Sequence, residues 1–282
     1  MSIQELILRL QQFWADQGCY LAPSYDVEVG AGTMTPDTFF NVLRKRPVRV
    51  AYIQPSRRPT DGRYGENPHR VQKHFQFQVI LKPAPENSQE LYIKSLEYIG
   101  IDLSKHDLRF DEDDWEAPTI GAWGIGWQVL LDGLEITQFT YFQQAGGVEL
   151  EEVPVELTYG IERLEMFLEE KDSIYELEWG GGLTYGDLRK REEKEFSLYN
   201  FEKADKNLMF ELFEKFHGET KRLIEENLLL PAYDYVLKCS HIFNMLDSLG
   251  VISVGERMKY ILKIRELACQ IAERFVKEET SE

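Results

Sequence analysis

The chain has 282 residues, of which 43% are hydrophobic and 29% are charged, and its formal net charge at neutral pH is −17. This is the composition of a globular protein with a sizeable core, and no stretch approaches the roughly 20 apolar residues that a membrane-spanning helix needs. A sequence pI near 4.8 argues against a protein that binds DNA or RNA over its whole surface, because nucleic-acid affinity depends on neutralising phosphates.

The cysteines and the N-terminus indicate the compartment. Glutamates and glutamines stand near the N-terminus, where a signal peptide has a basic start and an apolar run. Cys19, Cys239 and Cys269 are odd in number and lack C-x-x-C spacing, so we expect three reduced thiols in a cytoplasmic protein. The five histidines form no cluster with metal-ligand spacing, which argues against a structural zinc site.

The first third of the chain predicts a helix and two strands. Apolar residues at helical spacing predict an amphipathic helix over about 2–17, with Gly18 as its stop. An extended segment follows, in which Pro23 favours an edge or irregular strand. Residues 48–54 and 75–81 alternate and are rich in β-forming residues, which predicts two antiparallel strands joined by a long loop. Loops of this length are often functional.

The later segments predict a further strand and several helices. Residues 129–143 predict a strand that Asp132-Gly133 can break, and residues 161–168 carry one apolar helical face. Beyond residue 200 the pattern becomes all-helical, with three amphipathic segments. These segments are 205–227, 231–248 and 254–278, the last opened by the capping-box pair Ser253 and Glu256.

The long loop is strongly basic in an acidic chain. Residues 44–73 hold nine Lys or Arg against two acids, so this segment is +7 and the remainder of the chain is −24. Four of these residues, Arg57, Arg58, Arg63 and Arg70, lie within fourteen positions. Such focused charge favours a small polyanion in a cleft over a duplex on a face. An ordinary solvated loop is the alternative, chiefly for Arg58 and Arg63.

Two further residues complete a set suited to a triphosphate. Arginine forks match phosphate and carboxylate oxygens bidentately. Arg163 falls in the first turn of a predicted helix, where free backbone N–H groups also favour anions. Glu135 is an acid in an otherwise apolar strand, a position that suits a cation such as Mg²⁺. The alternative for Glu135 is the solvated face of its strand.

The order of these motifs resembles the class II aminoacyl-tRNA synthetases. The opening helix with CYLAPSYD resembles the first class motif, which builds the dimer interface. QPSRRPTDGRYGENPHR with HFQFQV resembles the second motif, and ELTYGIERLE resembles the third. Over essentially its full length the chain resembles the alpha-subunit family of the bacterial heterotetrameric glycine–tRNA ligases. LEITQFTYFQ and ELTYGIER also resemble the catalytic core of alanine–tRNA ligase.

The resemblance implies an α+β fold. Its core would be the class II antiparallel sheet of six or seven strands flanked by helices, followed by a C-terminal helical domain. The implied divisions are a class II catalytic domain over 1–170, a connecting segment over 171–200 and a helical domain over 201–282.

The resemblance also implies the residues that bind ATP. Arg57 would hold the α-phosphate and the amino-acid carboxylate, and Arg70 and Arg163 would hold the outer phosphates. Glu135 with Gln138 would contact Mg²⁺ and the α-phosphate.

The adenine ring would stack on Phe75. The second motif lacks the usual R-x-E pattern, so its register leaves Arg58 as the alternative to Arg57 and Phe77 as the alternative to Phe75.

A second group of residues is implied for glycine. Glu156, seven residues before Arg163, matches the acid that binds the substrate ammonium in the alanine enzyme. Gln76 and Gln78 would face the amino acid. Trp115 and Thr140 would shrink the pocket until no side chain fits; without the resemblance, Trp115 would be assigned to core or lid packing.

The function implied is that of a glycine–tRNA ligase alpha subunit. It would activate glycine with ATP to glycyl-adenylate and transfer glycine to the 3′ end of tRNA(Gly) within an α2β2 enzyme. The implied partners are the beta subunit, a second alpha chain and tRNA(Gly), which would be bound mostly through the beta subunit. One alternative is a catalytically silent class II paralogue acting as a regulatory or binding subunit, and another is an ATP-dependent ligase with a non-tRNA acceptor.

Overall fold

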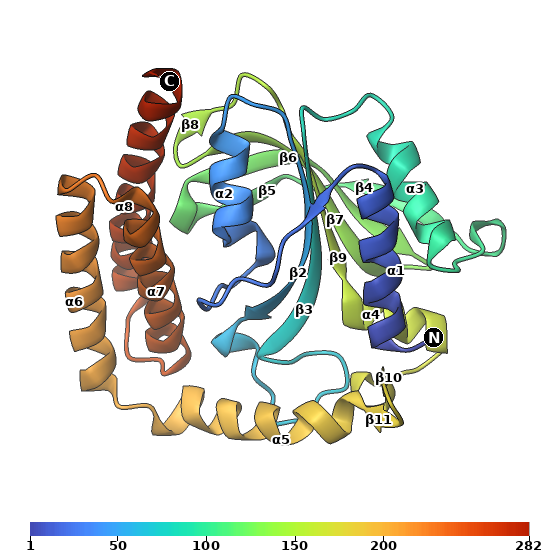
Figure 1. Ribbon diagram of the computed structural model, residues 1–282. Coiled ribbons are helices and arrows are strands. Elements are labelled where there is room, and N and C mark those ends of the chain that lie inside the picture. Colours follow the sequence, from blue (N-terminus) through green and yellow to red (C-terminus); the bar gives the residue numbers. More distant parts are fainter. Residues whose placement is uncertain (282) are drawn as a thin grey trace.

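In the computed structural model, which describes residues 1–281, a nine-stranded sheet lies between two groups of helices (Figure 1). The described strands follow the order β1-β2-β3-β9-β7-β6-β4, with β5 beside β6 and β8 beside β7. Only β1 and β2 pair in parallel; the other pairs are antiparallel. The strands are β1 (Tyr20–Leu21), β2 (Val48–Arg57), β3 (Lys73–Lys82), β4 (Leu108–Glu112), β5 (Trp115–Ala117), β6 (Ala122–Leu131), β7 (Leu134–Ala145), β8 (Val148–Glu149) and β9 (Val155–Gly160).

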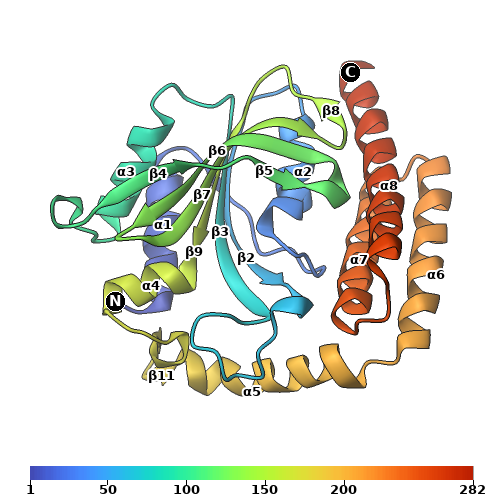
Figure 2. The ribbon, with the colours of Figure 1, turned by 180° about the vertical axis from the view of Figure 1, so that it is seen from behind.

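The helices lie on both faces of this sheet and at one end of it (Figures 1 and 2). They are α1 (Ile3–Asp16), α2 (Pro36–Leu43), α3 (Ser88–Tyr98), α4 (Ile161–Glu169), α5 (Tyr185–Leu198), α6 (Lys206–Glu225), α7 (Leu229–Ser248) and α8 (Val254–Ser281). A separate two-stranded hairpin, β10 (Glu178–Gly180) with β11 (Leu183–Thr184), precedes α5. Among the described residues, no helix is both long and apolar enough to span a bilayer.

Most predicted elements are confirmed. The helix expected over 2–17 is α1, the two strands that flank the basic loop are β2 and β3, and Ser253 with Glu256 forms the expected capping box of α8. The predicted strand over 129–143 is in fact a hairpin of β6 and β7. Asp132 and Gly133 form its turn, both with positive φ (49° and 85°), which is the backbone that a tight right-twisting hairpin requires.

Alternation along β3 divides the molecule into two hydrophobic cores. The first core contains Phe75, Phe77 and Val79 of β3, packed with residues of α1, α3 and α4. The second core contains Ile80 of β3 together with buried residues of α2, α6, α7 and α8. Because successive residues of a strand point to opposite faces, Gln76 lies on the face of the second core.

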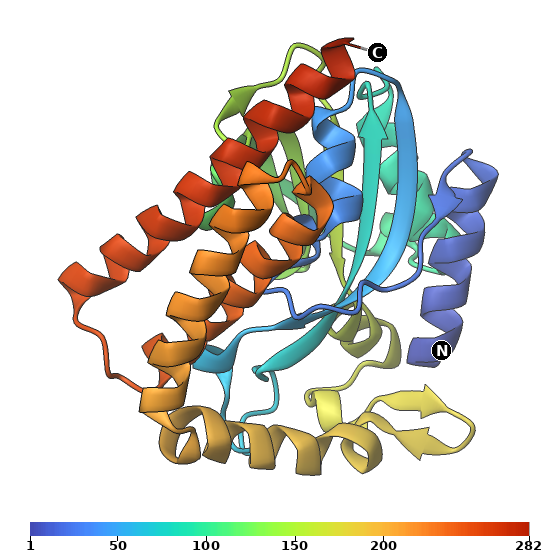
Figure 3. The same cartoon turned by 60° about the vertical axis from the view of Figure 1, so that its left-hand side comes forward.

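The C-terminal helices share their core with the sheet. Figure 3 shows α6, α7 and α8 side by side, with α5 running beneath them and beneath the loop between β2 and β3. Tyr233 of α7 stacks on Phe39 of α2 with ring centroids 4.3 Å apart, and Phe40 packs 4.8 Å from Phe275 of α8. The helices after residue 200 therefore continue the hydrophobic core of the second sheet face.

Gly126 tests the pairing of β6 with β7. A Cβ at this position would lie 2.0 Å from the carbonyl oxygen of Phe139, so Gly126→Ala forces the two strands apart. We expect the free energy of unfolding to fall by about 1–3 kcal/mol in a urea titration, as overpacked sites do. The control is Gly218→Ala on exposed α6, where nothing lies within 4 Å of the added Cβ. That change should be neutral or should stabilise by up to about 1 kcal/mol, and a Gly126→Ala protein of wild-type stability would contradict the pairing.

Candidate active site

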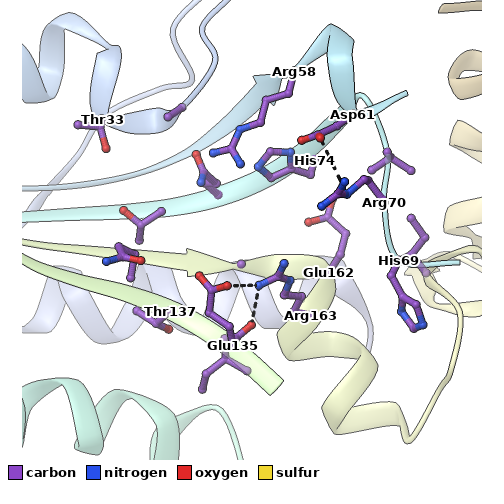
Figure 4. Close-up of a pocket in the computed structure, with 18 of the residues that line it drawn as sticks. Thr33, Arg58, Asp61, His69, Arg70, His74, Glu135, Thr137, Glu162 and Arg163 are labelled. Atoms are coloured by element: carbon purple, nitrogen blue, oxygen red, sulfur yellow. Dashed lines mark hydrogen bonds and ion pairs between the residues drawn. The ribbon is translucent and has the colours of Figure 1, made fainter. Parts of the chain in front are cut away.

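A cavity of about 360 Å³ opens on the second face of the sheet, beyond the part that the C-terminal helices cover (Figure 4). Its walls come from the loop between β2 and β3, from the strands β3, β7 and β9, and from the start of α4. Three sequence segments that are far apart in the chain therefore meet at one opening.

An incompletely paired carboxylate lies buried behind the cavity wall. Glu156 on β9 is only 1% exposed. Its Oε1 accepts hydrogen bonds from Thr33 Oγ1, at 2.8 Å, and from Gln78 Nε2. Its Oε2 accepts no hydrogen bond of normal geometry. Burial raises the pKa of Glu156 to about 8, against the opposing effect of Thr33, Gln78 and Thr158.

Two more unsatisfied oxygens lie on the same face of the sheet. Gln78 Oε1 and Thr140 Oγ1 are buried and make no hydrogen bond within the described part of the chain. Thr140 is the cross-strand partner of Glu156, and Gln78 donates to that carboxylate. Because buried polar groups in native proteins are almost always paired, three unpaired acceptors together indicate a missing donor. A small cation with several N–H groups fits this set.

Two aromatic rings and a glycine form the neighbouring wall of the cavity. Trp115 on β5 faces Gly124 on β6, and its ring lies 5.2 Å from that of Phe142. A Cβ at Gly124 would lie 2.5 Å from Thr140 Cγ2, so only glycine leaves Thr140 in place. Trp115 lines the cavity itself, and Thr140 lies behind it.

The basic loop supplies the outer part of the cavity. Arg58 lines it, with its Nε donating to the carbonyl oxygen of Gly30 at 2.9 Å. Arg70 lines it too, and its Nε lies 3.9 Å from Asp61 Oδ1. Arg57 does not line the cavity: its guanidinium lies over the ring of Phe196, 5.1 Å from the centroid.

Alternation of β2 explains the difference between the two arginines. Ser56 pairs with His74, and Arg57 with Lys73, in the β2–β3 register. Ser56 therefore shares the sheet face of His74, which lines the cavity, and Arg57 points to the opposite face. Arg58, just beyond the end of β2, returns to the face of the cavity. Of the two register alternatives, the structure brings Arg58 to the cavity.

The same alternation places the aromatic residues of β3. Phe75 is buried in the first core, 5.3 Å from the ring of Trp179, and Phe77 lies beside it in that core. Neither ring lines the cavity, whereas His74 does. Burial and the positive charges of Arg58 and Arg163 lower the pKa of His74 to about 3, so the ring is neutral at physiological pH. The sequence contains a signal for His74: in a strand, residues two apart point to the same face, so His74 shares the face of Gln76 and Gln78.

Arg163 and Glu135 pair across the cavity floor. Arg163 donates to Glu135 Oε2 at 2.8 Å and to its backbone oxygen at 3.1 Å, as Figure 4 shows. Both side chains remain partly exposed, at 48% and 39%. Gln138 lies nearby and donates to Asp113 Oδ2 at 2.9 Å. Arg163 and Glu135 thus neutralise one another.

Glu162 of α4 forms hydrogen bonds with the start of β3. Its carboxylate accepts from the backbone N–H of Phe75, at 2.9 and 3.1 Å, and from the Tyr185 hydroxyl at 3.1 Å. Burial raises the pKa of Glu162 to about 7. This contact fixes the start of β3 against the first turn of α4, where Arg163 lies. Nothing in the sequence pattern distinguishes Glu162 from an ordinary helical acid.

The predicted residues therefore divide into three groups. Arg70, Gln76, Trp115, Glu135, Gln138 and Arg163 line the cavity. Gln78, Thr140 and Glu156 lie buried directly behind its wall. Arg57 and Phe75 lie outside it. The lining residues that sequence reasoning missed include Thr33, Asp61, His69, His74, Thr158 and Glu162.

Comparison with known proteins gives one consistent family. The profile of the glycyl-tRNA synthetase alpha subunit family matches residues 3–280. The glycine–tRNA ligase alpha subunit of Coprothermobacter proteolyticus is 59% identical over 278 residues, which cover 99% of this chain and 96% of that protein.

Solved structures of pyrrolysyl-tRNA synthetase from Desulfitobacterium hafniense are more distantly similar. One aligns at a TM-score of 0.45 and 14% identity, over 64% of this chain and 73% of its own. A second aligns at 0.45 and 16% identity, over 65% and 75%.

The buried Glu156 carboxylate predicts a pH dependence of stability. Because its folded pKa, about 8, lies above its usual value of 4.5, the folded protein retains a proton that the unfolded chain loses. Between these pH values the free energy of unfolding therefore falls as pH rises, at up to about 1.4 kcal/mol per pH unit. Glu156→Gln removes this contribution. The free energy of unfolding of the variant minus that of the wild type should therefore be larger at pH 8 than at pH 5.

Urea titrations of the ligand-free protein at pH 5, 6.5 and 8 measure this difference. Glu162 and Glu165, whose pKa values burial also raises, are present in both proteins and cancel in the comparison. Glu116→Gln, on the exposed side of β5, is the control and should follow the wild-type profile. Parallel profiles for Glu156→Gln and wild type would contradict the prediction.

Proposed function

The chain belongs to the glycyl-tRNA synthetase alpha subunit family, and from this membership we propose that it activates glycine with ATP and transfers it to the 3′ end of tRNA(Gly). It is an aminoacyl-tRNA ligase, with ATP as a substrate. One observation carries the assignment of the site. A buried carboxylate with unpaired acceptor oxygens around it lies directly behind an arginine-lined cavity.

Glycine would bind through its ammonium group at Glu156. An ammonium offers three N–H donors, and Glu156 Oε2, Gln78 Oε1 and Thr140 Oγ1 are three unpaired acceptors. The positive charge would favour the ionised carboxylate and so lower the pKa of Glu156 in the complex. Gln76 lies two residues before Gln78 on β3, on the same face and nearer to the basic loop. Its side-chain oxygen accepts hydrogen bonds from Gly32 N and Ser56 Oγ.

Selection against larger amino acids would be steric. Trp115 and Thr140 stand where a side chain would emerge from the bound amino acid, and Phe142 supports the indole from behind. A close-packed wall can exclude an amino acid with one extra methyl strongly, because protein interiors have little spare volume. A pocket built for a larger amino acid discriminates less against a smaller one, since the unfilled methylene costs only about 1–3 kcal/mol of binding free energy.

ATP would occupy the outer, arginine-lined part. Because Arg58 lines the cavity and Arg57 does not, we assign the α-phosphate and the glycine carboxylate to Arg58. Arg70 and Arg163 would bind the outer phosphates. For the same reason, the ring proposed to lie against adenine is that of His74 rather than Phe75, and its neutral state lets it stack without repelling the arginines.

A magnesium ion would be held jointly with the triphosphate. No group of three His, Cys, Asp or Glu side chains suited to a metal occurs within residues 1–281. Mg²⁺, however, usually takes one or two carboxylates plus phosphate oxygens and water, so Glu135 fits as its protein ligand beside Gln138. The bound ion would neutralise phosphate charge. Glu135 would have to exchange its contact with Arg163 for this role.

The chemistry follows from positioning. An oxygen of the glycine carboxylate attacks the α-phosphorus in line, and pyrophosphate leaves with the electrons of the broken P–O bond, giving glycyl-adenylate. A ribose hydroxyl of the terminal adenosine of tRNA then attacks the carbonyl carbon, forms the ester and releases AMP. Neither step needs a side-chain nucleophile, because orientation and charge neutralisation by Arg58, Arg70 and Arg163 lower the barrier.

The proposed assembly is α2β2. The edge strand β1 and helix α1 leave Leu8, Tyr20 and Leu21 between 43% and 56% exposed, which suits the expected contact with a second alpha chain. An acidic surface suits a subunit that leaves most of the tRNA to the beta subunit. We place the enzyme in the cytoplasm, in keeping with three free cysteines. Nothing favours a catalytically silent subunit, because the cavity keeps its arginines.

The first test is amino-acid-dependent ATP–pyrophosphate exchange with and without the beta subunit. We expect exchange with glycine and none with alanine or serine. Arg163→Ala should reduce the rate at least about 100-fold, since it removes a charge that stabilises the outer phosphates. No exchange with glycine, even with the beta subunit present, would refute the proposed function.

The two neighbouring arginines form a matched pair. Arg58→Ala should lower kcat/KM for ATP by about 100-fold or more, as the loss of a charged phosphate contact does. Arg57→Ala should stay within about threefold of wild type in the same exchange assay, because the Arg57 guanidinium lies over Phe196 and does not line the cavity. The reverse order would return the phosphate role to Arg57.

A further inference from the structure

Helix α5 holds the basic loop from outside the sheet. Figure 3 shows it running directly beneath the loop between β2 and β3. The loop packs closely there: a Cβ at Gly62 would lie 2.8 Å from Ser197 Oγ and 2.9 Å from the ring of Phe201. The helix is thus in contact with the segment that carries Arg58 and Arg70.

One buried carboxylate of α5 binds both arms of that loop. Glu193 is 3% exposed. Its Oε1 accepts the backbone N–H of Arg63, and its Oε2 accepts that of Gln72, both at 2.8 Å. Hydrogen bonds to a charged acceptor are roughly twice as strong as neutral ones. A single rigid group therefore sets the distance between two backbone positions that are nine residues apart.

A second residue of α5 extends this contact. Ser197 Oγ donates to Glu193 Oε1 at 3.1 Å and accepts the backbone N–H of Tyr64 at 3.0 Å. Lys73, where β3 begins, forms an ion pair with Glu192 of the same helix. Glu193 and Ser197 thus bind the loop through main-chain N–H groups, which leaves the side chains of Arg58 and Arg70 free for other contacts.

The side chains that the arms carry are those of the outer cavity. The first arm, before Arg63, bears Arg58 and Asp61, and the second arm, before Gln72, bears His69 and Arg70. The glycine subsite, by contrast, is built by β3, β7 and β9 and makes no contact with Glu193 in the structure. Changing Glu193 should therefore disturb the arginines selectively.

We propose that Glu193 is a positioning residue of the reaction, which holds the two arms of the basic loop so that Arg58 and Arg70 meet the triphosphate at a fixed spacing. This inference rests on the proposed function for the identity of the ligand. The segment expected only to connect two domains then contributes directly to the geometry of the ATP site.

The test is Glu193→Gln in the full α2β2 enzyme. Glutamine keeps the shape but presents an NH₂ donor to one of the two backbone donors, so one arm loses its acceptor. We expect KM for ATP to rise about tenfold or more in pyrophosphate exchange, the loss expected for a hydrogen bond to a charged group, while KM for glycine stays within about twofold. Glu195→Gln, on the exposed side of α5 in an ion pair with Arg191, is the control and should leave both constants unchanged.

Hydrogen exchange gives a readout that does not depend on activity. In Glu193→Gln the amides of Arg63 or Gln72 should lose at least about tenfold of their protection, while those of β3 and β9 keep theirs. Ser197→Ala is the milder variant if Glu193→Gln does not fold, and it should raise KM for ATP about threefold with KM for glycine unchanged.

The outcomes separate the two proposals. A folded Glu193→Gln enzyme with an unchanged KM for ATP, or with both KM values raised equally, would overturn the positioning role. If Ser197→Ala is measured instead, an unchanged KM for ATP, or an equal rise in both KM values, would likewise overturn the positioning role. A wild-type enzyme without glycine-dependent exchange would instead refute the proposed function, and hydrogen exchange would still decide whether Glu193 holds the loop.

Discussion

The alternation of side chains along β3 is the constraint on which the site depends. This central strand lies between β2 and β9, and each of its residues must point either into the core under α1, α3 and α4 or to the second face, which holds the second core and the cavity. Phenylalanines take the first face and His74, Gln76 and Gln78 take the second. A shift of one residue would bury the glutamines among apolar side chains and expose the phenylalanines, at a cost of several kcal/mol for the unpaired amides alone. The polar set of the cavity is therefore fixed by the burial of its apolar neighbours.

Charge balance accompanies the arginines of the cavity. Arg163 pairs with Glu135, and Arg70 lies near Asp61, so the cations are partly neutralised by the acids that face them. These pairs are substantially exposed and contribute little to stability, which leaves them free to exchange partners. Glu156 differs, because it is buried and has no cation. Burial raises its pKa, so a cation that bound beside Glu156 would favour the ionised carboxylate and lower that pKa.

Two helices support the site. Glu162 fixes the start of β3 to α4, and Glu193 fixes the basic loop to α5; each uses a buried carboxylate that accepts backbone N–H groups. Such contacts hold the main chain, so the side chains that face the cavity are free to bind ligand. The C-terminal helices contribute by closing the second core around Tyr233 and Phe39, and the cavity lies beyond the part of that face that they cover.

The sequence by itself determined the family and many of the elements, and it supplied candidate residues for the site. Helical and strand periodicity located α1, β2, β3 and the three C-terminal helices, because these patterns are local and each element must bury its own apolar face. The motifs predicted Arg70, Glu135, Glu156 and Arg163 as site residues, and these four lie in or directly behind the wall of the cavity. Only the tertiary structure shows that Arg58 and His74 line the cavity and that Arg57 and Phe75 do not, since the face to which a residue points depends on strand register. It alone revealed Glu162 and Glu193, because an acid on a helix takes its meaning from the distant backbone N–H groups that it meets.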